Sequence, residues 1–131
     1  NNKKKTKLID RSEALSCCVL MLVLFLLTST LASDHTATPS TYRSLLTGLV
    51  PGDTLTLSDG SYGYLPLSNI QGTAAQRIVI QGASLNAVVN GQSCCNTVEI
   101  RNCSFVTLRQ LTIASLNFND GIKVQSPSND L

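Results

Sequence analysis

The residues of this chain that could do chemistry are a few charged side chains in its second half. Arg101, Arg109 and Lys123 are the candidate cations, and Glu99 and Asp120 are the acids near them. A lysine or arginine next to a hard-cation site could act as a base, and a cation could neutralise a carboxylate on a substrate. The acids form no cluster at metal-ligand spacing. From the sequence we therefore assign no metal site, no cofactor site and no catalytic residue.

Each of these side chains also has a structural interpretation. Glu99 and Lys123 would pair across neighbouring strands if they occupy one outward position on successive repeats, which would contribute about 0–1 kcal/mol. Arg101 and Arg109 would be solvated on outer faces. Asp120 begins an Asp-Gly pair that is typical of a tight turn.

The N-terminal 32 residues have the organisation of a secretory signal peptide. Lysines and Arg11 precede the uncharged 14-residue run Ala14–Leu27, and Thr30-Leu31-Ala32 fits a cleavage site. That run is shorter than the roughly 20 residues needed to cross a bilayer. We predict cleavage after Ala32 and a secreted, extracellular protein, with an uncleaved signal anchor in the membrane as the alternative.

Secretion changes how the five cysteines are interpreted. Cys17 and Cys18 would leave with the signal peptide, so that Cys94, Cys95 and Cys103 remain. An odd number in an oxidising compartment leaves one thiol free or paired outside this sequence. Two interpretations stay open, a local disulfide to Cys103 or small buried residues in a turn.

The charge distribution argues against a nucleic-acid partner. The formal net charge is +2, but residues 1–32 hold five basic and two acidic residues, whereas residues 33–131 hold five basic and six acidic ones. The second part has no basic patch with interleaved aromatic residues, so we expect no nucleic-acid binding.

Short alternating strands recur along the chain after residue 50. Their first apolar members are 23, 20 and 24 residues apart, and are Leu55, Ile78, Val98 and Ile122. A second set follows ten residues behind, and consists of Leu65, Val88 and Leu108. Strands that return at this spacing are typical of a solenoid. We therefore place the first set in one inward column and predict an outward column of Thr56, Val79, Glu99 and Lys123.

Two elements precede the repeats. Residues 33–39 are predicted to be a polar linker, in which His35 is solvated. Apolar residues then follow at helical spacing, and are Tyr42, Leu45, Leu46 and Leu49. We predict a short amphipathic helix that covers the exposed apolar end and open strand edge of the first coil.

The order of these segments carries a resemblance to a known family. The segments are Gly48–Tyr62, Gly72–Gly82, Val98–Ile100 and Phe105–Ile113. Over about residues 40–125 the chain resembles the N-terminal part of the secreted right-handed parallel β-helix proteins of the pectate-lyase-like superfamily. The nearest likeness is to the polysaccharide lyases that include chondroitinase B and alginate lyases. The expected fold is therefore an all-β, right-handed parallel β-helix with a capping helix. Residues 40–131 would be the N-terminal part of this domain, which is truncated.

The resemblance implies that the intact protein is a polysaccharide lyase that cleaves acidic, uronate-containing polysaccharide by β-elimination, with Ca²⁺ as a possible cofactor. In that group the catalytic basic residues and the calcium ligands lie in later coils, so none maps onto this sequence. Arg101 and Arg109 would at most line a groove for an acidic glycan. We expect an N-terminal fragment without activity of its own. The alternative is a non-catalytic extracellular β-helix that binds glycans or has a structural role.

Overall fold

The computed structural model describes residues 31–92, 96–115 and 120–131. Residues 1–30, which hold nearly all of the predicted signal peptide, lie outside these ranges, as do Cys94 and Cys95. Within the described ranges no helix is both long and apolar enough to span a membrane. The description below concerns the unit Leu31–Leu131.

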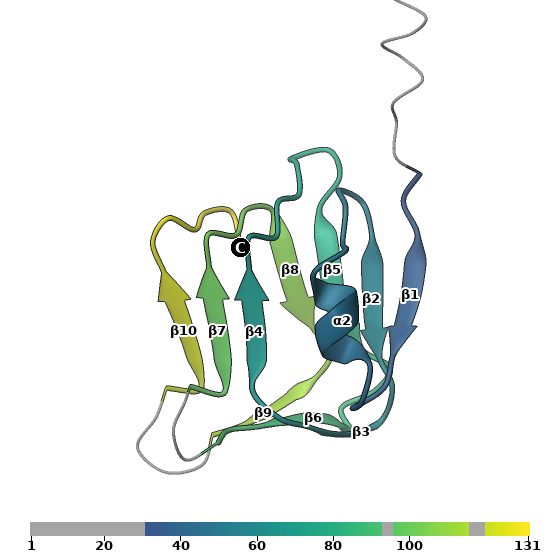
Figure 1. Cartoon of the computed structure of the whole chain (residues 1–131), viewed down its shortest axis with the longest axis vertical. Coiled ribbons are helices and arrows are strands. Elements are labelled where there is room, and N and C mark those ends of the chain that lie inside the picture. The colour runs from purple at the N-terminus through teal and green to yellow at the C-terminus, as the bar shows by residue number, and fades with distance from the viewer. Residues whose placement is uncertain (1–30, 93–95, 116–119) are drawn as a thin grey trace, which may run out of the picture. The chain divides into compact units, whose positions relative to one another are not determined.

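The described residues of this unit form three parallel sheets and one short helix (Figure 1). Sheet A has the order β1-β2-β5-β8, and its strands are Asp34–Ala37, Thr54–Leu57, Ile78–Gly82 and Val106–Arg109. Sheet B has the order β3-β6-β9, with Gly60–Tyr62, Ala87–Asn90 and Thr112–Ala114. Sheet C has the order β10-β7-β4, with Ile122–Gln125, Val98–Arg101 and Leu65–Ser68. Helix α2 spans Tyr42–Leu46. The mostly β, parallel character is as predicted.

The register differs from the predicted columns. In sheet A, Leu55 pairs with Ile80, which pairs in turn with Leu108. Val98 belongs to sheet C, where it pairs with Leu65 and Ile122. The predicted column of Leu55, Ile78, Val98 and Ile122 is therefore wrong, because its first two members lie in sheet A and its last two in sheet C.

The outward column is wrong for the same reason. Thr56 pairs with Gln81 rather than Val79 in sheet A, whereas Glu99 and Lys123 are indeed neighbours, in sheet C. The misassignment comes from unequal connections. Nine residues separate β4 from β5, but only four separate β7 from β8. Similar spacings in the sequence therefore join strands of different sheets.

The core lies between the sheets because alternate residues of each strand point inward. In β2, β4, β5 and β7 buried residues, nearly all of them aliphatic, alternate with half-buried or exposed ones. Burial of such aliphatic side chains is the main stabilising contribution to a fold. The strands thus show the period-2 pattern that the sequence predicted.

Helix α2 packs on this core, as predicted, but the open edge of β2 that it was also expected to cover is paired with β1 instead. Tyr42 and Leu46 are buried, and Leu45 and Leu49 pack against the core cluster. The rings of Tyr42 and Tyr62 meet edge to face, with their centroids 5.3 Å apart. Aromatic pairs favour this geometry because the positive edge of one ring meets the negative face of the other.

The predicted linker is corrected by the structure. Residues Asp34–Ala37 form strand β1, which pairs in parallel with β2. His35 is not simply solvated, because its Nε2 lies 3.4 Å from Oδ2 of the buried Asp53. The polar composition did not indicate a strand, because Ala37 is the only buried residue of β1.

The turns that follow strands β4 and β7 each contribute one asparagine to a pair of side-chain amides. Asn69 and Asn102 both have positive φ angles, which asparagine tolerates better than most residues. Asn102 Nδ2 donates to Asn69 Oδ1 at 2.7 Å. Cys103, which follows, is buried and free, and its thiol donates to the carbonyl oxygens of Leu67 and Arg101. The sequence left open whether Cys103 forms a local disulfide or is a small buried residue in a turn. The structure has the second arrangement.

Candidate binding face on sheet C

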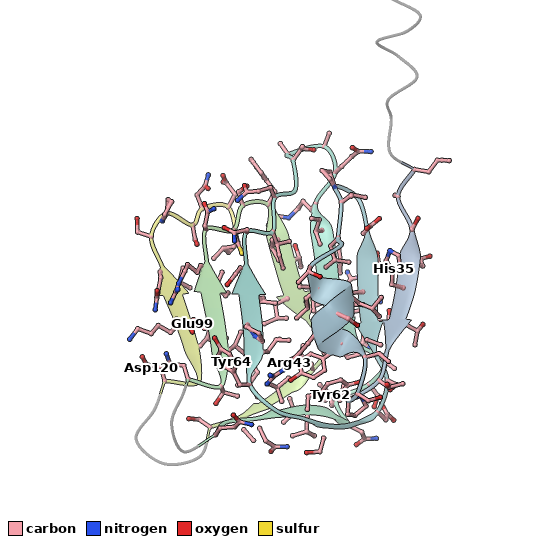
Figure 2. The ribbon with its side chains drawn as sticks, viewed as in Figure 1. His35, Arg43, Tyr62, Tyr64, Glu99 and Asp120 are labelled. Atoms are coloured by element: carbon pink, nitrogen blue, oxygen red, sulfur yellow. The ribbon has the colours of Figure 1, made fainter. Side chains whose placement is uncertain are left out.

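The outer face of sheet C holds most of the charged residues singled out in the sequence. The register aligns its outward residues in two rows that cross the strands, which are Pro66, Glu99 and Lys123, and Ser68, Arg101 and Gln125. Adjacent strands lie about 4.8 Å apart, so neighbours in a row are within side-chain reach. We refer to these six residues and Tyr64 as the sheet C face, of which Glu99 and Tyr64 are labelled in Figure 2.

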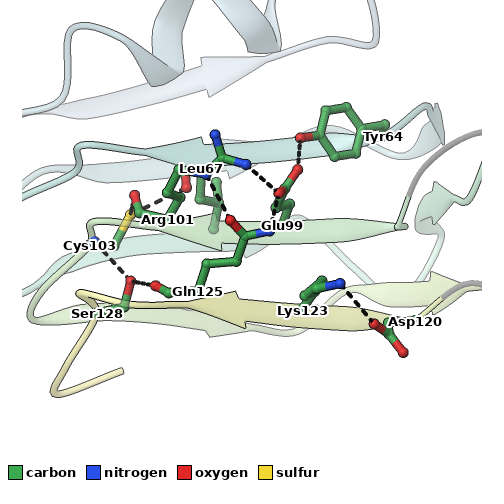
Figure 3. Close-up of polar contacts among 9 residues, drawn as sticks. All are labelled: Tyr64, Leu67, Glu99, Arg101, Cys103, Asp120, Lys123, Gln125 and Ser128. Carbon is green, nitrogen blue, oxygen red and sulfur yellow. Dashed lines mark hydrogen bonds and ion pairs between the residues drawn. The ribbon is translucent and has the colours of Figure 1, made fainter.

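Glu99 is the centre of this face. Tyr64 Oη donates to Glu99 Oε2 at 2.5 Å, from the connection that leads into β4. Arg101 Nη2 and Gln125 Nε2 both donate to Glu99 Oε1, at 2.8 and 2.6 Å (Figure 3). The side chain of Glu99 is only 18% exposed. Three donors from three segments therefore hold this carboxylate in one position.

These contacts set the protonation state of Glu99. The hydrogen bond from Tyr64 is the largest cause that lowers the pKa of the Glu99 carboxyl below its usual value, and the hydrogen bond and charge of Arg101 act in the same direction. Partial desolvation opposes them. Glu99 is therefore ionised at neutral pH, and a carboxyl group with a lowered pKa is a weak general base.

Arg101 is held on the same face. Its Nε donates to Gln125 Oε1 at 3.0 Å, while its Nη2 bonds Glu99. The Arg101 side chain is still 57% exposed, so the guanidinium presents charge to solvent. The prediction of an outer-face arginine is confirmed, with the addition that its orientation is fixed by two partners.

Lys123 does not form the ion pair expected of it. Although it lies beside Glu99 in the ladder, its Nζ forms an ion pair with Asp120 Oδ2, at 3.9 Å. Both side chains of this pair are well exposed, at 47% and 61%, so solvent screens the interaction strongly. The ion-pair partner of Glu99 is Arg101 instead. Lys123 thus keeps its ammonium group accessible.

Arg109 lies apart from these residues. It is on the outer side of β8 in sheet A, where its Nε donates to Gln81 Oε1 at 2.9 Å. Glu99, Arg101, Lys123 and Asp120 are brought together by the fold, and Arg109 is not.

Sequence reasoning missed two members of the sheet C face and one polar residue of helix α2. Tyr64 and Gln125 were not singled out, because only the register shows that both reach Glu99. Arg43 lies next to Tyr42 on the helix. Its Nε donates to Tyr42 Oη at 3.0 Å, and this hydrogen bond is the main cause that raises the pKa of Arg43. Nothing in the sequence pattern distinguishes these three from ordinary surface residues.

The described residues do not fit the calcium ion that the family resemblance implies. Among them, no three His, Cys, Asp or Glu side chains are grouped so that they could hold a metal ion. Asp120 faces Lys123, and its backbone carbonyl accepts a hydrogen bond from Thr97 N. We therefore derive no chemical step that passes through a metal.

Comparison of the chain with protein-family models, with curated proteins and with solved structures gave no significant match.

Proposed function

We propose that residues 31–131 are coils of a right-handed parallel β-helix that binds acidic, uronate-containing polysaccharide across the sheet C face. The strand order supports the β-helix, because the chain visits sheets A, B and C in the same sequence three times and all strand pairs are parallel. Crossover connections between parallel strands are nearly always right-handed.

The proposed binding rests on one observation, which is that the negative charge of the sheet C face is hydrogen-bonded within the protein while its positive charges are exposed. Glu99 is ionised, but its oxygens are occupied by Tyr64, Arg101 and Gln125. Lys123 and the outer edge of Arg101 remain exposed on neighbouring strands. Exposed cations on a rigid sheet suit a polymer that carries regularly spaced carboxylates.

The β-elimination suggested by the resemblance needs a base at C5 of the uronate and a positive group at its carboxylate. Glu99 is unsuited to the role of base, because the contacts around it lower its pKa. We assign the described residues to polysaccharide binding and none of them to catalysis. Lyase activity remains our proposal for the whole protein, as does its export. The alternative is a non-catalytic glycan-binding β-helix. It is favoured by Glu99, because both of its carboxylate oxygens already accept hydrogen bonds.

The first test is affinity electrophoresis of the full chain in gels that contain polygalacturonate or alginate, against a neutral galactan. We expect retardation by the two uronate polymers and none by galactan, with the retardation falling as salt rises. Lys123→Gln should weaken binding about two- to fivefold, which corresponds to about 0.4–1 kcal/mol.

Two matched variants sharpen this test. Glu99→Gln removes a negative charge from the sheet C face, so it should strengthen binding or leave it unchanged. Arg109→Gln removes one positive charge from sheet A and should have no effect. Equal weakening by Lys123→Gln and Arg109→Gln would mean that net charge, rather than this face, determines binding. Absence of binding to both polymers would refute the proposed function, and release of unsaturated uronate by this chain would show that a catalytic residue lies within it.

A further inference from the structure

Asp53 is a buried carboxylate beside the predicted processing site. It is 1% exposed, and it lies in the Pro51-Gly52-Asp53 turn before β2. Val50 N donates to Asp53 Oδ2 at 2.9 Å, and Ser33 N donates to Oδ1, also at 2.9 Å. Within the described part of the chain, the only ion-pair partner of Asp53 is His35, at 3.4 Å.

This arrangement leaves an acid without a permanent positive partner. Burying a charged carboxylate is unfavourable unless it is paired and hydrogen-bonded. His35 is 35% exposed and carries a charge only when it is protonated. The two backbone N–H donors are neutral. A further positive charge near Oδ1, where Ser33 N lies, would therefore stabilise the buried carboxylate.

The sequence predicts a source for that charge. Ala32 is the last residue of the predicted signal peptide, so the peptide nitrogen of Ser33 would become the new N-terminus. Leu31, Ala32 and Ser33 are exposed and belong to neither a helix nor a strand. Ser33 is fixed on its other side, because its carbonyl oxygen accepts from Thr54 N at 3.0 Å in line with the β1–β2 ladder.

We propose that removal of residues 1–32 creates an ion pair between the α-ammonium group of Ser33 and the Asp53 carboxylate. This pair stabilises the attachment of β1 to β2 in the processed protein. Hydrolysis of the Ala32–Ser33 peptide bond consumes one water molecule. At neutral pH it leaves a carboxylate on Ala32 and an ammonium group on Ser33. The nitrogen does not need to move, because it already lies at hydrogen-bond distance from Oδ1.

The pair would make the N-terminal edge of sheet A depend on processing. The hydrogen bond from Ser33 N is already charge-assisted by the carboxylate, and an ammonium group at the same place would add the attraction between opposite charges, which is screened less for a buried group such as Asp53. The α-ammonium group has three hydrogens, so it can also reach other acceptors, but the Asp53 carboxylate is the acceptor that the structure places against it. Removal of residues 1–32 would thus stabilise the folded protein in addition to releasing it from the signal peptide.

The composition of the chain makes a specific test possible. After removal of residues 1–32, Lys123 is the single remaining lysine. In a Lys123→Arg background the Ser33 amine is therefore the sole primary amine, so that an amine-reactive acetylating reagent modifies no other amine, and any thioester on a cysteine is removed with hydroxylamine. N-terminal sequencing of exported protein should first give Ser33, and the thermal midpoint is then compared between free and acetylated protein.

We expect acetylation to lower the thermal midpoint by about 4–8 °C. The Asp53→Asn protein keeps one of the two oxygen acceptors but not the charge, and acetylation should lower its thermal midpoint much less. Asp34→Asn removes an exposed carboxylate of β1 and serves as the matched control, which should behave as the parent protein. If Asp53→Asn fails to fold, an equal drop in the parent and in Asp34→Asn still supports the pair. No drop in the parent protein, a drop that is lost in Asp34→Asn, or a mature N-terminus other than Ser33 would overturn the proposal.

Discussion

Val98→Ala and Val124→Ala delete the same two methyl groups from inward positions of adjacent strands, yet we expect them to have unequal effects on stability. Val98 lies in β7 between Leu65 and Ile122, and it is fully buried. Each buried methyl group contributes about 0.8 kcal/mol, and the cavity left behind adds a further cost, so we expect a loss of about 2–3 kcal/mol. Val124 lies in the edge strand β10 and is 53% exposed. Its truncation loses about half of the transfer energy and leaves no closed cavity, so we expect about 1 kcal/mol or less.

The measurement is urea unfolding followed by circular dichroism, with the free energies extrapolated to water for the parent and both variants. Equal slopes against urea would show that the variants unfold to comparable states. The free energy lost in Val98→Ala should exceed that lost in Val124→Ala by about 1–2 kcal/mol. Equal losses would refute the reasoning, because they would mean that Val124 is covered in solution, for example by a second copy of the chain. Repeating the experiment at several protein concentrations identifies that case.

Two other variants test local features of the fold. In Glu99→Gln the acid dependence of stability should become shallower than in the parent protein. Contacts in the folded state lower the pKa of Glu99 from its usual value of 4.5, so the parent has a stabilising contribution above that value that is lost as the pH falls through the folded-state pKa. An unchanged pH profile between neutral pH and acid unfolding would contradict the contacts assigned to Glu99. Gly82→Ala should lower the free energy of unfolding by about 1–3 kcal/mol, because a Cβ atom there would meet the backbone carbonyl oxygens of Gln110 and Ser84. Gly63→Ala is the matched control, since its new Cβ would lie 3.3 Å from the end of the Gln92 side chain and its cost should stay within about 0.5 kcal/mol; equal effects in urea unfolding would count against the close packing at Gly82.

The sequence determined the local character of this protein. Alternation of aliphatic and polar residues predicts strands at the Leu55, Ile78, Val98 and Ile122 segments, and strands are present at all four. Helical spacing likewise predicts α2 and its buried side chain Leu46. These predictions succeed because period-2 and period-3.6 patterns arise from backbone geometry within a single segment.

Only the tertiary structure decided which segments are neighbours. The pairing of Leu55 with Ile80 and the place of Val98 in sheet C depend on the lengths of the connections, which leave no periodic signal in the sequence. The sequence alone likewise predicted Lys123 as the partner of Glu99. The structure instead gives Glu99 a partner from its own strand, Arg101, and one from the connection before β4, Tyr64. The reason is physical, since register fixes which strands adjoin, while the reach and direction of each side chain decide which polar groups meet.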